Sequence, residues 1–284
     1  MKRPLDRTAL DSHPLPPVTD GDKESKGRIL VIAGSRAVPG AALLCATAAM
    51  RAGAGKLRIA TVQSVAPRIG ILMPEAMVVA LTEDGDGGFA ERAAKPLAEQ
   101  AANVDAVVAG PGVKHNEGCA AIAAALMESD AALALDVGIL KALEPPKTQR
   151  EPLPVLLPDT DELASLLDCG EDEVARDPLG CGMRAAERYR SVLLVKGPVS
   201  HVVAPDGDSW IFESGVPGLG VSGSGDVLAG IVGGLLARGA APLNALLWAV
   251  WLHGQAGAAL MRRFGPIGFL AREIADEVPA LMVG

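Results

Sequence analysis

The stretch VSGSGDVLAGIVGGLLARGA, residues 221–240, places one carboxylate between a cluster of small residues and a long apolar run. The apolar run predicts a buried helix that begins close to Asp226. The first N–H groups of a helix have no partner within it and carry about half a positive charge, which suits a phosphoryl group. We therefore interpret Gly223, Ser224 and Gly225 as a phosphate-binding loop, with Asp226 as the acid beside it. The alternative is that Asp226 only caps the helix.

Two common nucleotide motifs do not fit this glycine segment. Residues 218–223 match G-x-G-x-x-G, but residues 227–272 contain no Asp or Glu, so the acid of a dinucleotide-binding unit is missing. Gly55-Lys56 lacks the other residues of a P-loop. The predicted helix also contains Gly230, Gly233 and Gly234, each costing about 1 kcal/mol relative to Ala. That cost predicts close packing against a neighbour or a ligand.

Composition narrows the class of protein. The 284 residues carry a net charge of −8 and only 3% aromatic residues, which argues against a nucleic-acid partner. The apolar run 241–261 is interrupted by Asn244, His253 and Gln255, so a buried helix is favoured over a membrane span. The four cysteines form no C-x-x-C, and the N-terminus has no secretion signal, which predicts a cytoplasmic protein. The four histidines form no array, so no residue is assigned as a metal ligand.

Buried strands alternate with helices along most of the chain. Strands are predicted at 28–33, 56–61, 77–81, 106–110, 132–136, 154–158 and 191–197, a hairpin at 200–205 and 209–214, and helices at 39–53, 89–102, 119–129, 226–238, 242–262 and 267–277. This alternation predicts an α/β fold with a central, mostly parallel sheet covered by helices on both faces. Residues 1–27 form a polar, Pro-rich segment, and residues 28–284 are predicted to form a single domain.

Several strands end in small or charged residues. Gly34-Ser35, Gly110-Pro111-Gly112 and Lys196-Gly197 each follow a predicted strand. Because ligands bind beyond the carboxyl ends of parallel strands, these residues are expected to converge with the glycine segment on one site.

These motifs together resemble the nucleotide-dependent NAD(P)H-hydrate dehydratases of the ribokinase-like superfamily. The resemblance runs from about residue 15 to the end and rests on SGSGDVLAG, AAMRAGAGKLRIAT, DAVVAGPGV, LLVKG and WLHGQAG. It implies a ribokinase-like fold that binds ADP or ATP, with Mg²⁺, and hydrated NADH or NADPH as substrate. It also implies a homo-oligomer, since family members often form tetramers. The implied nucleotide-binding residues are Lys196, Gly197, Pro198, Val199, Ser200, Gly223, Ser224 and Gly225, and the implied substrate contacts are Ala41, Ala42, Gly112 and Asp226.

The implied chemistry gives Asp226 the role of general base. It would take the proton of the substrate C6 hydroxyl, the oxygen would attack the terminal phosphoryl group, and phosphate would then leave. An ordinary aspartate pKa suffices for this role at neutral pH. A small-molecule kinase of the same fold and a non-catalytic nucleotide-binding relative are the alternatives.

Three positions depart from the family pattern: Lys114, Gly138 and Asp159, the last replacing a substrate-contacting histidine. Asp159 is either a substrate contact, with Lys114 offsetting its charge, or the N-cap of a helix in a capping box with Glu162.

Four further residues have two interpretations each. Glu75 and Glu162 could hold Mg²⁺ through water or lie at the surface or in a cap. Asp136 could lie near the substrate or cap the segment after it. His253 is interpreted as a packed core histidine rather than a ligand.

Overall fold

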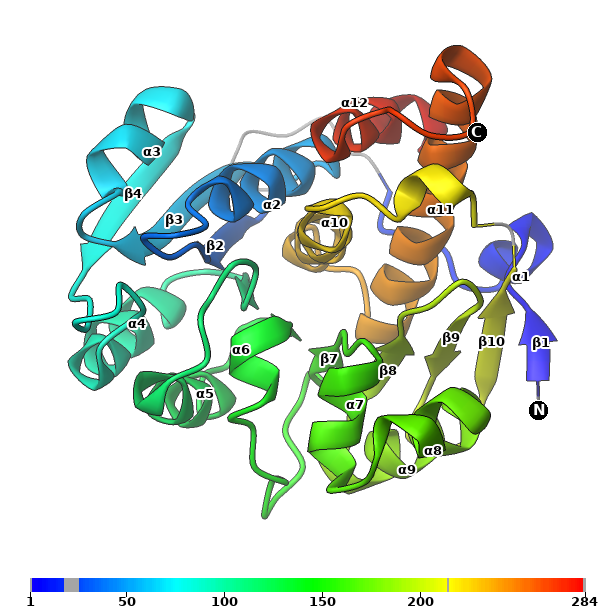
Figure 1. Ribbon diagram of the computed structural model, residues 1–284, viewed down its shortest axis with the longest axis horizontal. Coiled ribbons are helices and arrows are strands. Elements are labelled where there is room, and N and C mark those ends of the chain that lie inside the picture. Colours follow the sequence, from blue (N-terminus) through cyan, green and yellow to red (C-terminus); the bar gives the residue numbers. More distant parts are fainter. Residues whose placement is uncertain (1, 18–25, 214, 283–284) are drawn as a thin grey trace.

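The computed structural model describes residues 2–17, 26–213 and 215–282 (Figure 1). Their strands form one sheet in the order β1-β10-β9-β8-β7-β6-β5-β2-β3-β4. The parallel strands are β2 (Arg28–Ile32), β3 (Lys56–Val62), β4 (Ala76–Leu81), β5 (Ala106–Ala109), β6 (Ala132–Leu135), β7 (Val155–Leu156) and β8 (Val192–Val195). β9 (Ser200–Val203) runs antiparallel to β8 and to β10 (Ser209–Phe212), so the hairpin prediction is confirmed, although its residue 214 lies outside the described residues.

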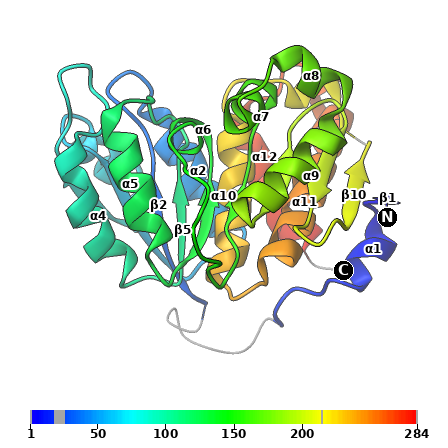
Figure 2. The same ribbon diagram turned by 90° about the horizontal axis from the view of Figure 1, so that it is seen from below.

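Helices cover both faces of this sheet, as predicted (Figures 1 and 2). One face carries α2 (Gly40–Arg51), α3 (Ala66–Leu72), α10 (Ser224–Ala237), α11 (Pro242–Phe264) and α12 (Ala271–Leu281). The other carries α4 (Ala94–Ala101), α5 (Glu117–Met127), α6 (Val137–Leu140), α7 (Thr160–Leu167), α8 (Glu171–Arg176) and α9 (Pro178–Tyr189). Two short 3₁₀ helices, η1 (Glu91–Ala93) and η2 (Pro217–Leu219), lie in connections. None of the described helices is long and apolar enough to cross a membrane.

The described part of the N-terminal segment adds elements that its polar composition did not predict. β1 (Lys2–Pro4) pairs in parallel with β10, and α1 (Arg7–Asp11) lies beside α11. The Trp248 indole N–H donates a hydrogen bond of 2.8 Å to the carbonyl of His13, which fastens this segment to α11. Residues 18–25, also part of the predicted segment, lie outside the described residues.

The interior glycines of α10 pack against protein. A Cβ at Gly230 would lie 2.2 Å from the carbonyl oxygen of Cys45 on α2, and one at Gly233 would lie 2.1 Å from a methyl group of Val108 on β5. These separations leave no room for a side chain, so the glycines let α10 lie close to both α2 and the sheet. Of the two expected causes, a neighbour rather than a ligand explains them.

The chain reverses direction across the sheet between β2 and β5. From β2 it proceeds outward to β3 and β4, and after α4 it returns to β5 on the other side of β2. The helices that follow β2 and β5 therefore lie on opposite faces of the sheet, and ligands of such sheets bind at the loops after these two strands. The Gly34 N–H donates a hydrogen bond of 2.8 Å to the Pro111 carbonyl, so both loops meet at the carboxyl edge.

Candidate active site

The carboxyl edge of the sheet brings charged residues together with helix N-termini. Asp136 follows β6, Asp159 follows β7 and Lys196 follows β8, all strands of the same parallel set. α2 and α10 begin at the same edge, and among the described residues neither has a side-chain hydrogen bond to its N-cap. In α10 the Ser224 N–H donates to the Val221 carbonyl at 3.1 Å, so among the described contacts the Gly225 and Asp226 N–H groups are the ones available to an anion.

A cavity of about 620 Å³ lies beside the start of α10. Six of the eight residues predicted to bind nucleotide line it, namely Lys196, Gly197, Pro198, Ser200, Ser224 and Gly225. The rest of the wall is largely apolar and comes from β10, η2 and α11, including Phe212, Leu219 and Val250. An apolar cavity with a few polar groups at one end has the character of a small-molecule site.

The other two predicted nucleotide residues, Val199 and Gly223, are not among the residues that line this cavity. Gly223 is the N-cap of α10 with φ +89°, a conformation that favours glycine. A Cβ there would also lie 2.5 Å from Leu44 of α2. Gly225 differs, because a Cβ built on it meets no described atom within 4 Å. Gly223 thus shapes the turn, and Gly225 leaves open space in front of the helix.

Asp226 lies in the first turn of α10, partly buried. Burial and the negative charge of Asp136 raise its pKa to about 6, although the positive charge of Lys196 acts in the opposite direction. The role requires only an ordinary pKa, and nothing in the sequence indicated the raised value, which comes first from burial and then from Asp136, 90 residues away in the chain. The carboxylate is ionised at neutral pH and more basic than an exposed aspartate, which suits a general base.

Lys196 is held by two buried carboxylates. Its ammonium Nζ lies 2.7 Å from Asp136 Oδ1 and 3.6 Å from Glu162 Oε2. Burial disfavours its charge, but the attraction of Asp136 and Glu162 outweighs burial and raises the pKa of Lys196. Glu162 has a raised pKa, mainly through burial. The Lys196 ammonium is therefore neutralised by Asp136 and Glu162 before any ligand binds.

Asp159 forms the capping box that was one of its two interpretations. Its carboxylate accepts the Glu162 N–H at 2.9 Å, and the Glu162 carboxylate accepts the Asp159 N–H at 2.9 Å. Lys114 is directed elsewhere, with its ammonium 3.3 Å from Asp86. The interpretation of Lys114 as the partner of Asp159 is therefore wrong, because the loop after β5 carries it toward Asp86.

The third departure, Gly138, has a packing cause. A Cβ on Gly138 would lie 2.5 Å from the Val113 carbonyl oxygen, so a larger residue does not fit this arrangement. The neighbouring Asp136 accepts the Val137 N–H at 3.1 Å and caps α6, one of the roles considered for it. Its contact with Lys196 is a further role that the sequence did not indicate.

The residues predicted to contact substrate lie on both sides of the point where the chain reverses. A Cβ on Gly112, after β5, would be 2.5 Å from the Cβ of Ala41 on α2, so the two backbones are in close approach. The Ala41 and Ala42 side chains are buried. The N-terminus of α2 at Gly40, rather than these side chains, is therefore available to a ligand.

The carboxyl edge of the sheet offers carboxylate oxygens, which suit Mg²⁺, but not a preformed set of ligands around one point. Among the described residues, no group of three or more His, Cys, Asp or Glu side chains could hold a metal ion. Asp136 and Glu162 are occupied by Lys196. Glu75 is exposed and precedes β4, which places it at the opposite edge of the sheet, so its interpretation as a Mg²⁺ ligand is wrong.

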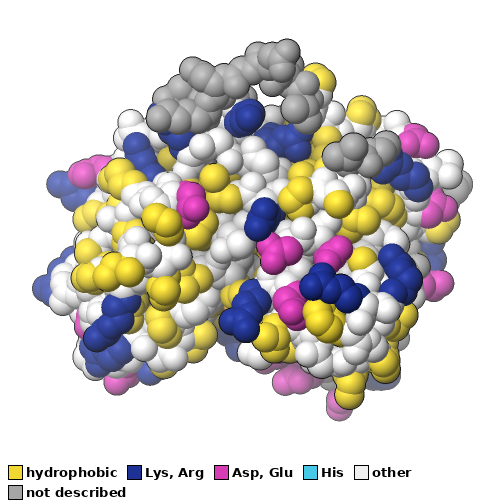
Figure 3. Space-filling view, turned by 90° about the horizontal axis from the view of Figure 1, so that it is seen from above, with side chains coloured by type: hydrophobic (Ala, Val, Ile, Leu, Met, Phe, Trp, Pro, Cys, Tyr) yellow, Lys and Arg dark blue, Asp and Glu magenta, His cyan; other side chains and the backbone are white. Residues whose placement is uncertain are grey.

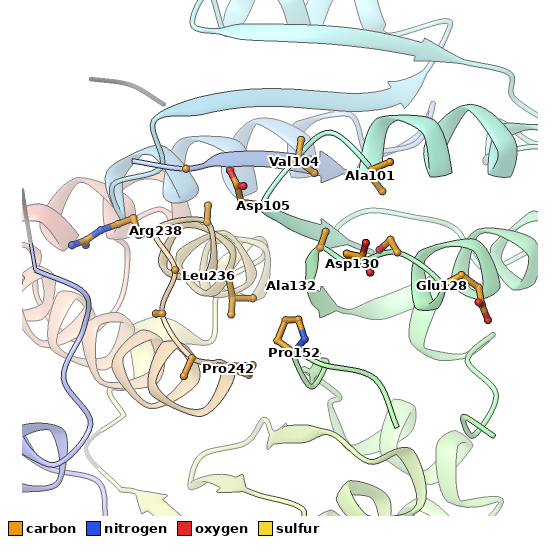
Figure 4. A pocket seen from close by; sticks show the side chains of 18 of the residues that line it. Ala101, Val104, Asp105, Glu128, Asp130, Ala132, Pro152, Leu236, Arg238 and Pro242 are labelled. Atoms are coloured by element: carbon orange, nitrogen blue, oxygen red, sulfur yellow. The ribbon is translucent and has the colours of Figure 1, made fainter. Parts of the chain in front are cut away.

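A larger cavity, of about 1010 Å³, lies at the opposite edge of the sheet (Figure 4). Its wall combines many alanines with charged residues such as Asp105, Asp130 and Arg238, and it contains none of the predicted site residues. Asp105 in this wall forms an ion pair with Arg28 at 3.1 Å. The polar groups at the carboxyl edge, rather than cavity size, therefore identify the candidate site.

The chain is similar to proteins of one family over nearly its full length. A family model described as NAD(P)H-hydrate dehydratase matches residues 29–280. An ADP-dependent (S)-NAD(P)H-hydrate dehydratase from Xanthomonas campestris is 44% identical over 99% of this chain and 96% of the relative. The chain spans about half the length of the bifunctional NAD(P)H-hydrate repair enzymes that it also matches.

Solved structures extend this likeness to the fold. An ADP/ATP-dependent NAD(P)H-hydrate dehydratase from Bacillus subtilis, co-crystallised with ATP and Mg²⁺, has a TM-score of 0.85 at 28% identity, over 98% of this chain and 97% of that one. A ribokinase-like superfamily protein from Enterococcus faecalis has a TM-score of 0.82 at 22% identity, over 99% of this chain and 95% of that one. The ribokinase-like fold expected from the sequence is thus confirmed.

Proposed function

The chain belongs to the NAD(P)H-hydrate dehydratase family, and from this premise we propose that it dehydrates hydrated NADH or NADPH at the expense of ADP or ATP. The observation that carries the proposal is Asp226, a carboxylate of raised pKa in the first turn of a helix whose N-terminus lacks a side-chain cap. Gly225, its neighbour, lines a cavity of about 620 Å³. Base and phosphate-binding donors are thereby adjacent.

The proposed reaction starts with proton transfer from the C6 hydroxyl of the substrate to the Asp226 carboxylate. The hydroxyl oxygen forms a bond to the terminal phosphorus of the nucleotide, and the bond from that phosphorus to the rest of the nucleotide breaks. The lone pair of the ring nitrogen then expels phosphate from C6. Loss of a proton from C5 restores the dihydronicotinamide. Phosphorylation makes this elimination possible because phosphate is a far better leaving group than hydroxide.

Different residues along the carboxyl edge bind the phosphates, the nucleotide base and the substrate. The N–H groups at the start of α10 bind the phosphates, while the apolar wall with Phe212 and Leu219 receives the base of the nucleotide. The substrate lies against Asp226, Gly112 and the start of α2. Mg²⁺ neutralises phosphate charge when bound. Lys196 is paired with Asp136 and Glu162, so a bound Mg²⁺ would take its oxygen ligands mainly from water and from the phosphates.

The test is a coupled assay of the purified protein on hydrated NADH with ADP and with ATP. We expect recovery of the dihydronicotinamide absorbance together with release of inorganic phosphate, in equal amounts. ADP is the expected donor, in keeping with the ADP-dependent relatives. Formation of a stable phosphorylated product without recovery of absorbance would instead identify a small-molecule kinase. If the assay shows neither absorbance recovery nor phosphate release with either nucleotide, the result contradicts an enzymatic role.

Self-association through α3 and β4 belongs to the same proposal. Ile71, Leu72 and Met77 are 80%, 65% and 53% exposed, and β4 is the last strand of the sheet, so apolar side chains lie beside an open strand edge. Hydrophobic side chains gather at this end of the molecule (Figure 3, left). Exposed apolar patches and unpaired edges favour association with another chain.

Light scattering of the purified protein tests this surface. We expect a homo-oligomer that dissociates when Ile71 and Leu72 are both replaced by Asp. The matched control is Ile267→Asp, which removes a side chain of similar exposure, 69%, outside α3 and β4. A monomeric wild-type protein, or equal dissociation in the control, would contradict the assignment.

We place this activity in the cytoplasm. The four cysteines are free thiols, as a reducing compartment would keep them, and the proposed substrate arises from the NADH and NADPH pools. Fractionation of the native host, with the protein followed by antibody, tests this assignment.

A further inference from the structure

His253 on α11 reaches the phosphate-binding loop. Its ring nitrogen Nε2 lies 3.0 Å from Ser224 Oγ and 3.1 Å from the Ser224 carbonyl oxygen, and the residue lines the cavity beside Gly225. The sequence pattern favoured core packing for this histidine. The two contacts connect it instead to the first residue of α10.

The carbonyl contact fixes which ring nitrogen carries the proton. A carbonyl oxygen can only accept, so Nε2 must be the N–H donor. Loss of hydration lowers the pKa of His253 to about 4, although the Ser224 carbonyl opposes this shift. The ring is therefore neutral at and above neutral pH, with its single hydrogen on Nε2 facing Ser224.

Holding the Ser224 carbonyl also orients the next N–H group. The peptide bond between Ser224 and Gly225 is planar and trans, so the Ser224 C=O and the Gly225 N–H point in opposite directions. Gly225 is the second residue of α10, and a Cβ built on it meets no described atom within 4 Å, so a ligand can approach its N–H closely. A bond to the carbonyl on one side therefore fixes the direction of the N–H on the other.

Two glycines let α11 approach closely enough for this contact. A Cβ on Gly254 would lie 2.2 Å from the Phe212 ring, and one on Gly257 would lie 2.7 Å from Leu219. Phe212 and Leu219 both line the cavity. The run His253-Gly254-Gln255-Ala256-Gly257 thus packs α11 against the cavity wall and places His253 at the glycine loop.

We infer that His253 is a positioning residue, whose neutral imidazole holds the Ser224 carbonyl and thereby directs the Gly225 N–H toward a phosphate of the bound nucleotide. The inference rests on the proposed function, since it assumes that nucleotide phosphates bind at the start of α10. It goes further by giving the LHGQAG motif a physical role in nucleotide binding.

Calorimetric titration of ADP into His253→Leu and His253→Gln tests the inference. Leu removes the donor, and we expect a rise in Kd of about tenfold, the scale of one hydrogen bond in a desolvated site. Gln can present an amide N–H near the position of Nε2, so it should recover most of the affinity. Because the imidazole is neutral, the loss in His253→Leu should be the same at pH 6.5 and pH 8.5. Wild-type affinity in the Leu variant, or equal losses in Leu and Gln, would overturn the inference.

Two further variants separate positioning from destabilisation. Ser224→Ala removes the hydroxyl but keeps the carbonyl, so its Kd should change far less than that of His253→Leu; an equal change would show that the hydroxyl carries the effect. Ala245→Gly weakens α11 two turns away, because glycine has a lower helix propensity than alanine, and should retain ADP affinity. An equal loss in this control would mean that helix stability, rather than the hydrogen bond, sets affinity.

The outcome is distinguishable from failure of the proposed function. A wild-type protein that does not bind ADP would contradict the proposed function itself. A wild-type protein that binds ADP, with a Leu variant that binds it equally well, would overturn only the role of His253.

Discussion

The helices α7 and α10 both begin at the carboxyl edge of the sheet with an aspartate, yet they use it differently. At α7, Asp159 is the N-cap, and its carboxylate accepts a helix N–H at 2.9 Å while Glu162 returns a matching bond. At α10, Gly223 is the N-cap and provides no side chain, and Asp226 stands inside the first turn with a pKa raised to about 6.

The difference separates an aspartate that satisfies its own helix from one left for a ligand. In α7 the donors and acceptors are reciprocally paired, which stabilises the fold and leaves little to offer a substrate. In α10 the N–H groups of Gly225 and Asp226 and the desolvated carboxylate cost stability in the absence of ligand, as reactive groups in active sites commonly do. Substitutions at the two helices should therefore have opposite consequences.

The largest expected effect is that of Asp226→Asn. The amide keeps the size of the side chain but cannot accept the substrate proton, so kcat should fall at least about 100-fold. ADP affinity should change little, because the backbone donors remain. Steady-state kinetics on hydrated NADH together with ADP titration check both values. Near-normal turnover would exclude Asp226 as the base.

The same variant should be more stable than the wild type. The raised pKa means that the protonated form of Asp226 favours the folded state and the ionised form favours unfolding. The stabilisation by the protonated form is fully present below the pKa of the unfolded chain and is lost as the pH rises through about 6. Removing that charge should raise stability above pH 7 by on the order of 2 kcal/mol, a few degrees in Tm. Thermal melts at pH 8 and at pH 4 measure it, and the gain should be smaller at pH 4.

Gly225 and Gly230 provide the next comparison, within α10 itself. A side chain at position 225 enters open space beside the cavity, so Gly225→Val should fold normally but raise the Kd of ADP by at least about tenfold, since it blocks close approach of phosphate. Gly230→Ala forces a methyl against the Cys45 carbonyl and should cost about 1–3 kcal/mol of stability with ADP affinity retained. Calorimetry and chemical denaturation on both variants distinguish the two losses. Wild-type affinity in folded Gly225→Val would mean that phosphate binds elsewhere.

The pH dependence of activity gives a smaller effect with a definite sign. The ionised form of Asp226 is the active one, so kcat/KM should be level above about pH 6 and decline below it. Asp136→Asn removes a neighbouring negative charge while keeping an acceptor for the Val137 N–H, so the decline should move to lower pH. A shift to higher pH, measured under conditions where circular dichroism shows the variant folded, would contradict the electrostatic account.

The parts of this molecule that the sequence predicted are those encoded locally. The buried strands, the glycine loop and Asp226 each occupy a short run whose pattern has a local physical meaning. The strands form the expected sheet, and the glycine loop and Asp226 stand at the start of α10. The contacts of Lys196 with Asp136 and of His253 with Ser224 join residues 60 and 29 positions apart, so no local pattern could reveal them.

Some helices and strands also lack a local signal. α8 has four charged residues among its six and buries only Val174, and α9 starts with Pro178 and includes Gly180 and Gly182. β1 has exposed residues throughout and is ordered by its pairing with β10. In each case tertiary contacts outweigh weak intrinsic preference.

The smallest effect is expected at Asp159, where capping and substrate binding can be told apart. If the carboxylate acts only as the N-cap of α7, Asp159→Ala should lower stability by about 1 kcal/mol, close to 2 °C in Tm, while Asp159→Asn keeps a cap acceptor and should lose less. Neither variant should alter the Kd for hydrated NADH, because the two bonds to Glu162 already fix the carboxylate within its own helix. Asp159→His restores the residue of the family pattern and discriminates further, since a substrate contact would improve affinity by about tenfold through loss of a repelling charge. Tightened substrate binding in Asp159→His, or in Asp159→Asn without a stability change, would show that α7 also presents its aspartate to the ligand, and the contrast between the two helices would then be one of degree.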